Sequence, residues 1–332
     1  MAAVVALLLA LLLAACGAAV PANPTATGRQ PADSPPTQPL SPPPAAYPRA
    51  VVDDEGTTVM LPQRPERIIS LTPATTEIVF ALGAGDRLVG RGDFDDYPPE
   101  AAELPGVAAF TGVNHEALVG LTPDLVLAGG NSFTPPEDIR RIRQLGVPVL
   151  VLYAGTVEGV LDDIQLVGRA IDAAPESDAL TAAMQQRIDE VTGAVAGLDR
   201  PRVFYQIGSE PAIYGPAPDS FVADLVALAG GQPITTTDPA VFEISVERLV
   251  EQDPQVIVLG DAQWGVCPAD VAARPAWGSM TAVREGAIRP VNDTIVTRPG
   301  PRLAEGLAAL ALAIHPEAAI EPPADALELC PE

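Results

Sequence analysis

The sequence predicts an α/β protein built from two Rossmann-like βα lobes, joined by a long helical connector, with a ligand cleft between the lobes. Two observations predict this fold. Short apolar runs alternate with amphipathic segments on both sides of residues 156–197, a stretch with helical periodicity alone. A helix–proline–strand segment also occurs once in each flanking part. The 332 residues are 48% hydrophobic and 19% charged, which leaves room for substantial cores.

The first segment is typical of an exported protein. Residues 2–15 are all Ala, Val or Leu, a run too short to span a bilayer but of the length found in signal peptides. Leu13-Ala14-Ala15-Cys16 resembles the bacterial lipobox, in which a peptidase cuts before the Cys and the Cys is diacylated. We expect residues 1–16 to be a lipoprotein signal peptide; the alternative is an ordinary cleavage site with an incidental Cys. The absence of a basic residue before the apolar run departs from the usual signal.

The next segment, residues 17–50, contains 10 Pro among 34 residues, together with Thr, Ser and Ala. This composition buries no core and favours extended polyproline conformations. We expect a disordered, semi-stiff tether that holds a folded body away from a membrane.

The folded body divides into three parts. The N-terminal lobe, residues 51–155, is expected to hold strands at 67–71, 124–129 and 148–153, with helices at 72–83 and 135–145. The helical connector, residues 156–200, has two helical stretches broken near Pro175. The C-terminal lobe, residues 201–332, is expected to hold strands at 202–208, 255–260 and 287–291 and a closing helix at 301–314.

An internal repeat links the two lobes. Residues 114–128 (NHEALVGLTPDLVLA) and 245–259 (SVERLVEQDPQVIVL) each begin with an N-cap residue, carry a Glu two positions later and a Pro seven after that, and end in a strand. The two acids are Glu116 and Glu247. A single carboxylate in a first helical turn is explained locally by the helix dipole. Two at equivalent places indicate docking to a two-fold symmetric partner through charge-assisted pairs with Arg.

With these segments the chain resembles a known family. RIISLTPATTEIVFALGAGDRLVG (67–90), DFDDYPPEA (93–101) and the two repeat segments are similar to the solute-binding proteins of ABC importers for vitamin B12, siderophores and haem, closest to the vitamin B12-binding branch. The resemblance covers about residues 51–315. It implies two α/β lobes joined by one long helix, a ligand cleft, and a Glu on each lobe that docks onto Arg residues of the permease dimer; those positions correspond to Glu116 and Glu247.

The cargo is expected to meet the loops that follow the strands, because ligands of open α/β sheets bind beyond the carboxyl ends of the strands. Six of the 14 aromatic residues lie in such loops, including Phe133, which indicates a flat or bulky apolar cargo. For each aromatic the alternative is packing at a lobe edge. The predicted ligand-binding residues are Phe94, Asp95, Tyr97, Phe110, Asn131, Tyr214, Trp264, Asp293 and Arg298. The resemblance places Phe94 and Phe110 where B12-binding members have a Tyr and a Trp against the corrin, and Arg298 near an Arg beside it, with a local spacing that differs by one residue.

No catalytic residue, metal site or resident cofactor is predicted; we expect the cargo itself to be a corrinoid or another metal chelate. The only two His residues, His115 and His315, lie 200 positions apart, and no HExxH or CxxC spacing occurs. With Cys16 lipidated, Cys267 and Cys330 remain as an even pair in an exported protein, which favours a disulfide over two free thiols.

These observations favour a non-catalytic, lipid-anchored extracytoplasmic receptor that captures a corrinoid and delivers it to an ABC permease dimer with its ATPase subunits. A ferric-siderophore or haem receptor is the alternative within the class, with Tyr214 as the one plausible haem ligand. A secreted α/β enzyme is a distant alternative, because no GxSxG motif is present. The net charge of −24 excludes a nucleic-acid partner, and we expect a monomer.

Overall fold

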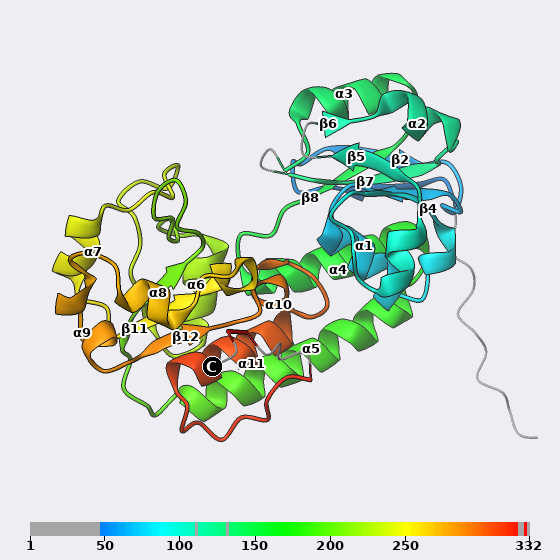
Figure 1. Ribbon diagram of the computed structural model, residues 1–332. Coiled ribbons are helices and arrows are strands. Elements are labelled where there is room, and N and C mark those ends of the chain that lie inside the picture. Colours follow the sequence, from blue (N-terminus) through cyan, green and yellow to red (C-terminus); the bar gives the residue numbers. More distant parts are fainter. Residues whose placement is uncertain (1–46, 110–111, 131–132, 325–328, 331–332) are drawn as a thin grey trace, which may run out of the picture. The chain divides into compact units, whose positions relative to one another are not determined.

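Two sheets organise the protein, which is described here from a computed structural model over residues 47–109, 112–130, 133–324 and 329–330 (Figure 1). The first sheet has six strands in the order β6-β5-β4-β3-β7-β8, and the second has four in the order β10-β9-β11-β12. All neighbours run parallel except β5 and β6. A separate antiparallel hairpin, β1 with β2, precedes the first sheet.

The N-terminal half runs from β1 to β8. Its strands are β1 (Arg49–Val52), β2 (Thr58–Leu61), β3 (Ile68–Ser70), β4 (Leu88–Gly92), β5 (Gly106–Ala109), β6 (Gly112–Val113), β7 (Leu125–Gly129) and β8 (Val149–Leu152). Its helices are α1 (Pro73–Ala81), α2 (His115–Gly120) and α3 (Pro136–Gln144), with short 3-10 turns η1 (Gly85–Arg87) and η2 (Pro99–Glu103).

The connector consists of α4 (Val157–Ile171) and α5 (Ala174–Val195), and the C-terminal half follows from β9 to α11. The strands of that half are β9 (Arg202–Gln206), β10 (Gln232–Pro233), β11 (Val256–Leu259) and β12 (Ile288–Pro290). Its helical elements are α6 (Phe221–Leu228), α7 (Val246–Gln252), η3 (Gly260–Trp264), α8 (Pro268–Ala272), η4 (Trp277–Ser279), α9 (Thr281–Arg284), α10 (Asp293–Thr297) and α11 (Leu303–Ile314).

The central strands are apolar on both faces because helices cover both. Along β7, Leu125 and Leu127 face a core with α1 and α4, while Val126 and Ala128 face a second core with α2 and α3. Figure 1 shows these two helix layers on opposite sides of the first sheet. The strand ends are therefore the places where this sheet can present side chains to a ligand.

The second sheet is covered in the same way. Ile257 and Leu259 of β11 face a core with α7, α8 and the buried Trp277. Val256 and Val258 face the other way, into the core that contains α5 and α11 and continues through α4 to the first sheet. One apolar core thus runs from sheet to sheet through the connector.

The α/β class and the predicted elements are confirmed, with differences at their ends. The resemblance implied one long connecting helix, but the structure has two packed against each other. Asp172 adopts a left-handed conformation (φ 63°) that ends α4, and α5 begins with Pro175 in its first turn, a position that Pro favours. The folded body also begins before residue 51, since Arg49 and Ala50, assigned to the tether, form part of β1.

Candidate functional site

Exposed aromatic side chains lie at the carboxyl ends of the strands of both sheets. Phe94 follows β4 and is 60% exposed, and Trp264, at the end of η3 after β11, is 80% exposed. Tyr97 is 40% exposed, and Tyr214 is half-buried on the loop after β9. Rings of this size gain about 0.5–1.5 kcal/mol beyond burial when they stack on a partner. Their exposure leaves the ring faces of Phe94 and Trp264 available to a cargo, whereas the Arg302 guanidinium lies 3.8 Å from the centre of the Tyr97 ring.

Three further exposed aromatic side chains lie near the strand ends and were not among the predicted binding residues. Phe133 follows β7 and is 76% exposed, Tyr153 follows β8, and Phe242 lies beside the loop after β9, where its carbonyl accepts a hydrogen bond from the Gly215 amide. Phe133 was visible in the sequence as a strand-end aromatic. Tyr153 was hidden at the last position of an expected strand, and Phe242 lies outside any strand-end segment.

Asp95, expected among the polar cargo contacts, is instead buried at 1% exposure. Its Oδ2 accepts hydrogen bonds from Thr76 Oγ1 at 2.6 Å and from the Gly92 amide at 3.1 Å, which ties the loop after β4 to helix α1. Burial raises its pKa to about 6, although these two hydrogen bonds lower it. A side chain in this position shapes the loop and offers no surface to a cargo.

Asp293 and Arg298 are also engaged by other protein groups. Asp293 Oδ1 accepts a hydrogen bond from the buried Tyr205 hydroxyl at 2.6 Å, and burial raises the pKa of Asp293. Arg298 forms ion pairs with Glu77 at 3.1 Å and with Asp96 at 2.7 Å. Asp293 is the first residue of α10, just after β12, and Arg298 is the C-cap of the same helix; the charged groups of both bind protein partners.

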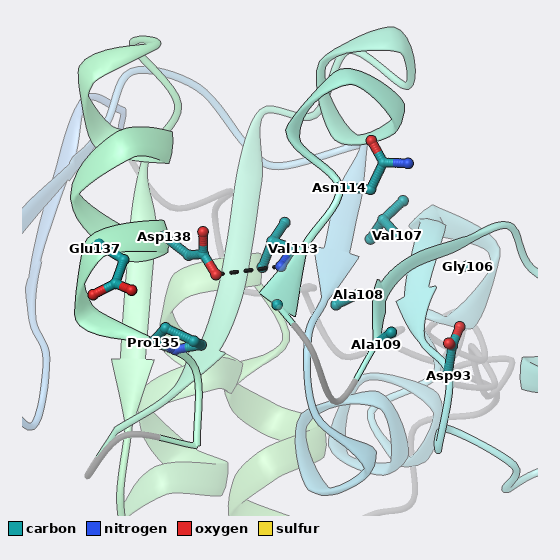
Figure 2. A pocket seen from close by; sticks show the side chains of 11 residues that line it. Asp93, Gly106, Val107, Ala108, Ala109, Val113, Asn114, Pro135, Glu137 and Asp138 are labelled. Carbon is teal, nitrogen blue, oxygen red and sulfur yellow. Dashed lines mark hydrogen bonds between the residues drawn. The ribbon is translucent and has the colours of Figure 1, made fainter.

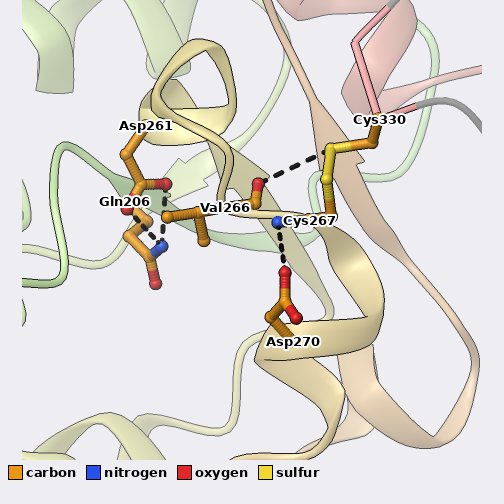
Figure 3. Close-up of a disulfide and its surroundings, with 6 residues drawn as sticks. All are labelled: Gln206, Asp261, Val266, Cys267, Asp270 and Cys330. Atoms are coloured by element: carbon orange, nitrogen blue, oxygen red, sulfur yellow. Dashed lines mark hydrogen bonds between the residues drawn. A yellow bond between two sulfur atoms is a disulfide. The ribbon is translucent and has the colours of Figure 1, made fainter.

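The loop that carries Trp264 is held from two sides. Asp261, in the first turn of η3, accepts hydrogen bonds from Gln206 Nε2 at 2.8 and 2.9 Å and from Ser209 Oγ at 2.9 Å, both from the end of β9. A few residues later, Cys267 forms a disulfide with Cys330, with a Cα–Cα distance of 5.6 Å. Figure 3 shows this bridge joining the C-terminal tail to the loop. The predicted Cys pairing is therefore present in the structure.

Glu116 and Glu247 occupy matching positions. Each lies exposed in the first turn of a short helix, α2 or α7, and neither makes a hydrogen bond or ion pair within the described part of the chain. The N-caps also match: Asn114 accepts from the Ala117 amide at 3.1 Å, and Ser245 accepts from the Arg248 amide at 3.2 Å. Fixed helix starts give both carboxylates a defined direction.

A pocket of about 480 Å³ lies beside the start of α2 (Figure 2). Asp93, Asn114, Glu137 and Asp138 contribute its polar side chains, and backbone of β5 and β6 completes it. Asp138 accepts hydrogen bonds from the Val113 amide and from His115 Nε2 at 2.7 Å, so His115 is fixed in place next to Glu116. Within the described residues, no group of three or more His, Cys, Asp or Glu side chains is placed so that it could hold a metal ion.

Comparison with known proteins decides the family. A model of the periplasmic binding protein family matches residues 68–292. The chain belongs to this family. A cobalamin-binding protein of Halobacterium salinarum is 32% identical over 281 residues, which cover 81% of this chain and 75% of that protein. An ABC transporter substrate-binding lipoprotein of Bacillus subtilis, YvrC, is 30% identical, covering 82% and 87%.

The fold of this family member is similar to a solved structure of the periplasmic vitamin B12-binding protein BtuF of Vibrio cholerae. The TM-score is 0.67 at 28% identity, and the match covers 76% of this chain and 97% of that one. The chain is therefore an extracytoplasmic solute-binding protein of an ABC importer, which binds a small-molecule cargo, and it is not an enzyme. In the part of the chain that the structure describes, no helix combines the length and apolarity needed to cross a bilayer.

Three predicted residues lie outside the described residues: Cys16, Phe110 and Asn131. The lipidation site and these two cargo positions stay predictions.

Proposed function

We propose that this solute-binding protein captures a corrinoid, acts as a monomer, and delivers its cargo to an ABC permease dimer driven by ATPase subunits. The observation that carries the proposal is the set of exposed aromatic rings at the strand ends of both sheets, with Phe94 on one and Trp264 on the other. A corrin is a large, flat ring with apolar faces, which aromatic side chains contact over a wide area with few rotors to order. The relatives from Halobacterium salinarum and Vibrio cholerae, named for cobalamin and vitamin B12, support this cargo class.

Permease docking is proposed for Glu116 and Glu247. They are exposed, similarly capped and one per half, which suits two Arg-bearing subunits of a permease dimer. Neither belongs to the strand-end loops that carry the exposed rings, so docking and cargo capture use separate surfaces.

The test of cargo is retention of a chromophore. The purified protein is incubated in parallel with cyanocobalamin, haem and a ferric siderophore, passed through a desalting column, and its absorbance spectrum recorded. We expect the cobalamin spectrum at about one per chain. Retention of haem alone or of the siderophore alone would show that the cargo is that chelate and not a corrinoid. Retention of no chromophore in any of the three incubations would contradict the cargo class.

Membrane anchoring through a lipid on Cys16 is the second part of the proposal, supported by the lipobox and by the name of the Bacillus subtilis relative. Cys16→Ser should move the protein from the membrane fraction to the soluble extracytoplasmic fraction, as measured by immunoblot of fractionated cells. The Cys267→Ser, Cys330→Ser variant, which lacks the other two thiols, is the control and should stay with the membrane. Unchanged membrane retention of Cys16→Ser would contradict the anchor.

A further inference from the structure

A buried carboxylate of the N-terminal half is bound by two Arg residues of the C-terminal half. The Glu77 side chain, on α1, is 2% exposed. It accepts from Arg302 Nε at 2.9 Å and Nη2 at 2.7 Å, and from Arg298 Nη1 at 3.1 Å. A buried charge with this number of charge-assisted hydrogen bonds is fixed in position.

The segment that supplies both Arg residues is itself restrained. Residues 298–302 read Arg-Pro-Gly-Pro-Arg, and the two prolines fix the backbone φ angle on either side of Gly300. Gly300 lies close to the start of α1, where a Cβ at this position would be 3.6 Å from Ala74. Arg298 and Arg302 thus flank Gly300 along the chain, at a place where the C-terminal half contacts α1 of the N-terminal half.

The same two Arg residues reach onward to the loop after β4. Arg298 Nη1 also binds Asp96 at 2.7 Å, and the Arg302 guanidinium lies 3.8 Å from the centre of the Tyr97 ring, a cation–π contact. One position earlier on α1, Thr76 holds Asp95 of this loop directly at 2.6 Å. Residues 95, 96 and 97 are each held in this way, and the exposed Phe94 directly precedes them.

We propose that Glu77, Arg298 and Arg302 are positioning residues, which act across the two halves to hold residues 93–97 in the conformation that presents Phe94 to the cargo. The inference rests on the proposed function, because it gives a role to a cargo-contacting ring. It also assigns the charge of Arg298 to the protein's own loop and not to a cargo carboxylate. A loop ordered before binding does not lose that conformational entropy on capture.

The first test needs no cargo. Hydrogen–deuterium exchange of the peptide containing residues 93–98 is compared between wild type, Glu77→Gln and the milder Asp96→Asn. We expect faster exchange of this peptide in both variants, while α3 keeps its protection. Asp53→Asn is the matched control, since Asp53 is also buried and ion-paired, to Arg143 at 3.0 Å within one half; it should leave residues 93–98 unchanged. Unchanged exchange of the loop in Asp96→Asn and Glu77→Gln would overturn the proposal.

The second test separates positioning from general stability with a double-mutant cycle on cyanocobalamin affinity. Glu77→Gln should weaken binding about three- to tenfold in the wild-type background and much less in Phe94→Ala, because its effect passes through that ring. Equal losses in both backgrounds would overturn the role. If wild type binds no cyanocobalamin, the proposed cargo has failed, whereas the exchange experiment still decides whether the Arg pair holds the loop.

Discussion

Apart from Phe133, the most exposed aromatic residues at the strand ends are Phe94 in the N-terminal half and Trp264 in the C-terminal half. We expect Phe94→Ala and Trp264→Ala each to weaken cyanocobalamin binding roughly two- to tenfold, because each removes a stacking face. Their exposure means that neither loss opens a cavity, so the free energy of unfolding should stay within about 0.5 kcal/mol of wild type. Isothermal titration calorimetry and urea melts measure the two quantities.

Leu145→Ala is the control for these variants, since Leu145 is 49% exposed at the end of α3 and is not a strand-end residue. It should leave the affinity unchanged. Wild-type affinity in the Phe94→Ala, Trp264→Ala double variant would remove both rings from the binding surface.

The buried carboxyl of Asp95 makes a prediction about pH. Its pKa is raised from 3.8 to about 6 in the folded protein, so the folded chain keeps a proton that the unfolded chain has already released. The stabilising contribution of the protonated Asp95 to the free energy of unfolding is fully present below pH 3.8. It is lost as the pH rises to about 6, and the free energy of unfolding falls by at most about 1.4 kcal/mol per pH unit over this range. Asp95→Asn, which does not titrate, should therefore gain stability relative to wild type over this range in urea melts at pH 4 to 7.

The next residue, Asp96, provides a control because its pKa shifts in the opposite direction. Burial raises the pKa of Asp96, but the hydrogen bond and charge of Arg298 outweigh it, and the net pKa is lowered. Its contribution is present above pH 3.8 and is lost as the pH falls through the lowered pKa. Asp96→Asn should therefore show no gain relative to wild type between pH 4 and 6. Parallel pH profiles for wild type and Asp95→Asn would contradict the buried titration.

At the scale of elements, α2 and α7 each present one carboxylate in the first turn, Glu116 and Glu247, and we expect these to act as a pair. Glu116→Ala and Glu247→Ala should each reduce transport in vesicles reconstituted with the permease, since loss of one partner leaves an Arg unpaired at a partly desolvated interface and costs about 2–5 kcal/mol. Cargo affinity should not change. The matched control is Glu137→Ala, an exposed first-turn Glu of α3 without a counterpart in the other half. Normal transport by the double variant would refute docking.

The repeat that identified these helices also shows how much of the fold the sequence can predict. Both N-caps, both helices and the strands after them, β7 and β11, form as expected, because caps, Pro and apolar runs act locally. Strand β4 was implied only by the expectation that residues 90–100 follow a strand, and its bounds were not predicted. Its sequence, Leu-Val-Gly-Arg-Gly, has few strand-forming residues and depends on pairing with β3 and β5. The break between α4 and α5 was predicted near Pro175 and occurs there.

For the site, aromatic residues after strands were predictable, but the partners of the charged residues were not. Sequence position placed Asp95 and Asp293 correctly close behind strands β4 and β12, whereas Arg298 lies beyond the helix α10 that follows β12. Their partners are Thr76, Tyr205 and Glu77, which lie 19, 88 and 221 positions away along the chain. Contacts over such separations depend on tertiary packing, and that between Glu77 and Arg298 depends on how the two halves meet; no local pattern encodes either.

At the scale of the whole molecule, the two halves share an apolar core through α4, α5 and α11 and are joined again by the Glu77 cluster. A large opening between the halves would expose this apolar surface to water, at a cost of about 25 cal/mol per Å². We infer that cargo capture depends on a prearranged surface more than on wide domain closure.

The charge of the whole molecule predicts which of several similarly shaped cargoes the protein prefers. The net charge is −24 and the chain contains no Lys. The six strand-end loops (residues 90–100, 108–112, 129–133, 208–216, 260–268 and 292–302) contain seven acidic and three basic residues, a formal charge of −4. Two of those basic residues, Arg298 and Arg302, bind Glu77. An anionic cargo would approach a net negative surface on which two of the three cations are already paired with Glu77.

We therefore expect a preference for neutral or cationic chelates over anionic ones. Cyanocobalamin should bind about tenfold more tightly at low salt than the same corrinoid with one side-chain amide hydrolysed to a carboxylate, because only the second is repelled. Raising the salt from 10 to about 500 mM shortens the screening length and should shrink this difference without weakening cyanocobalamin itself. If haem proves to be the cargo, haem and its dimethyl ester provide the same comparison. Equal affinity for the neutral and anionic forms at low salt would contradict this preference.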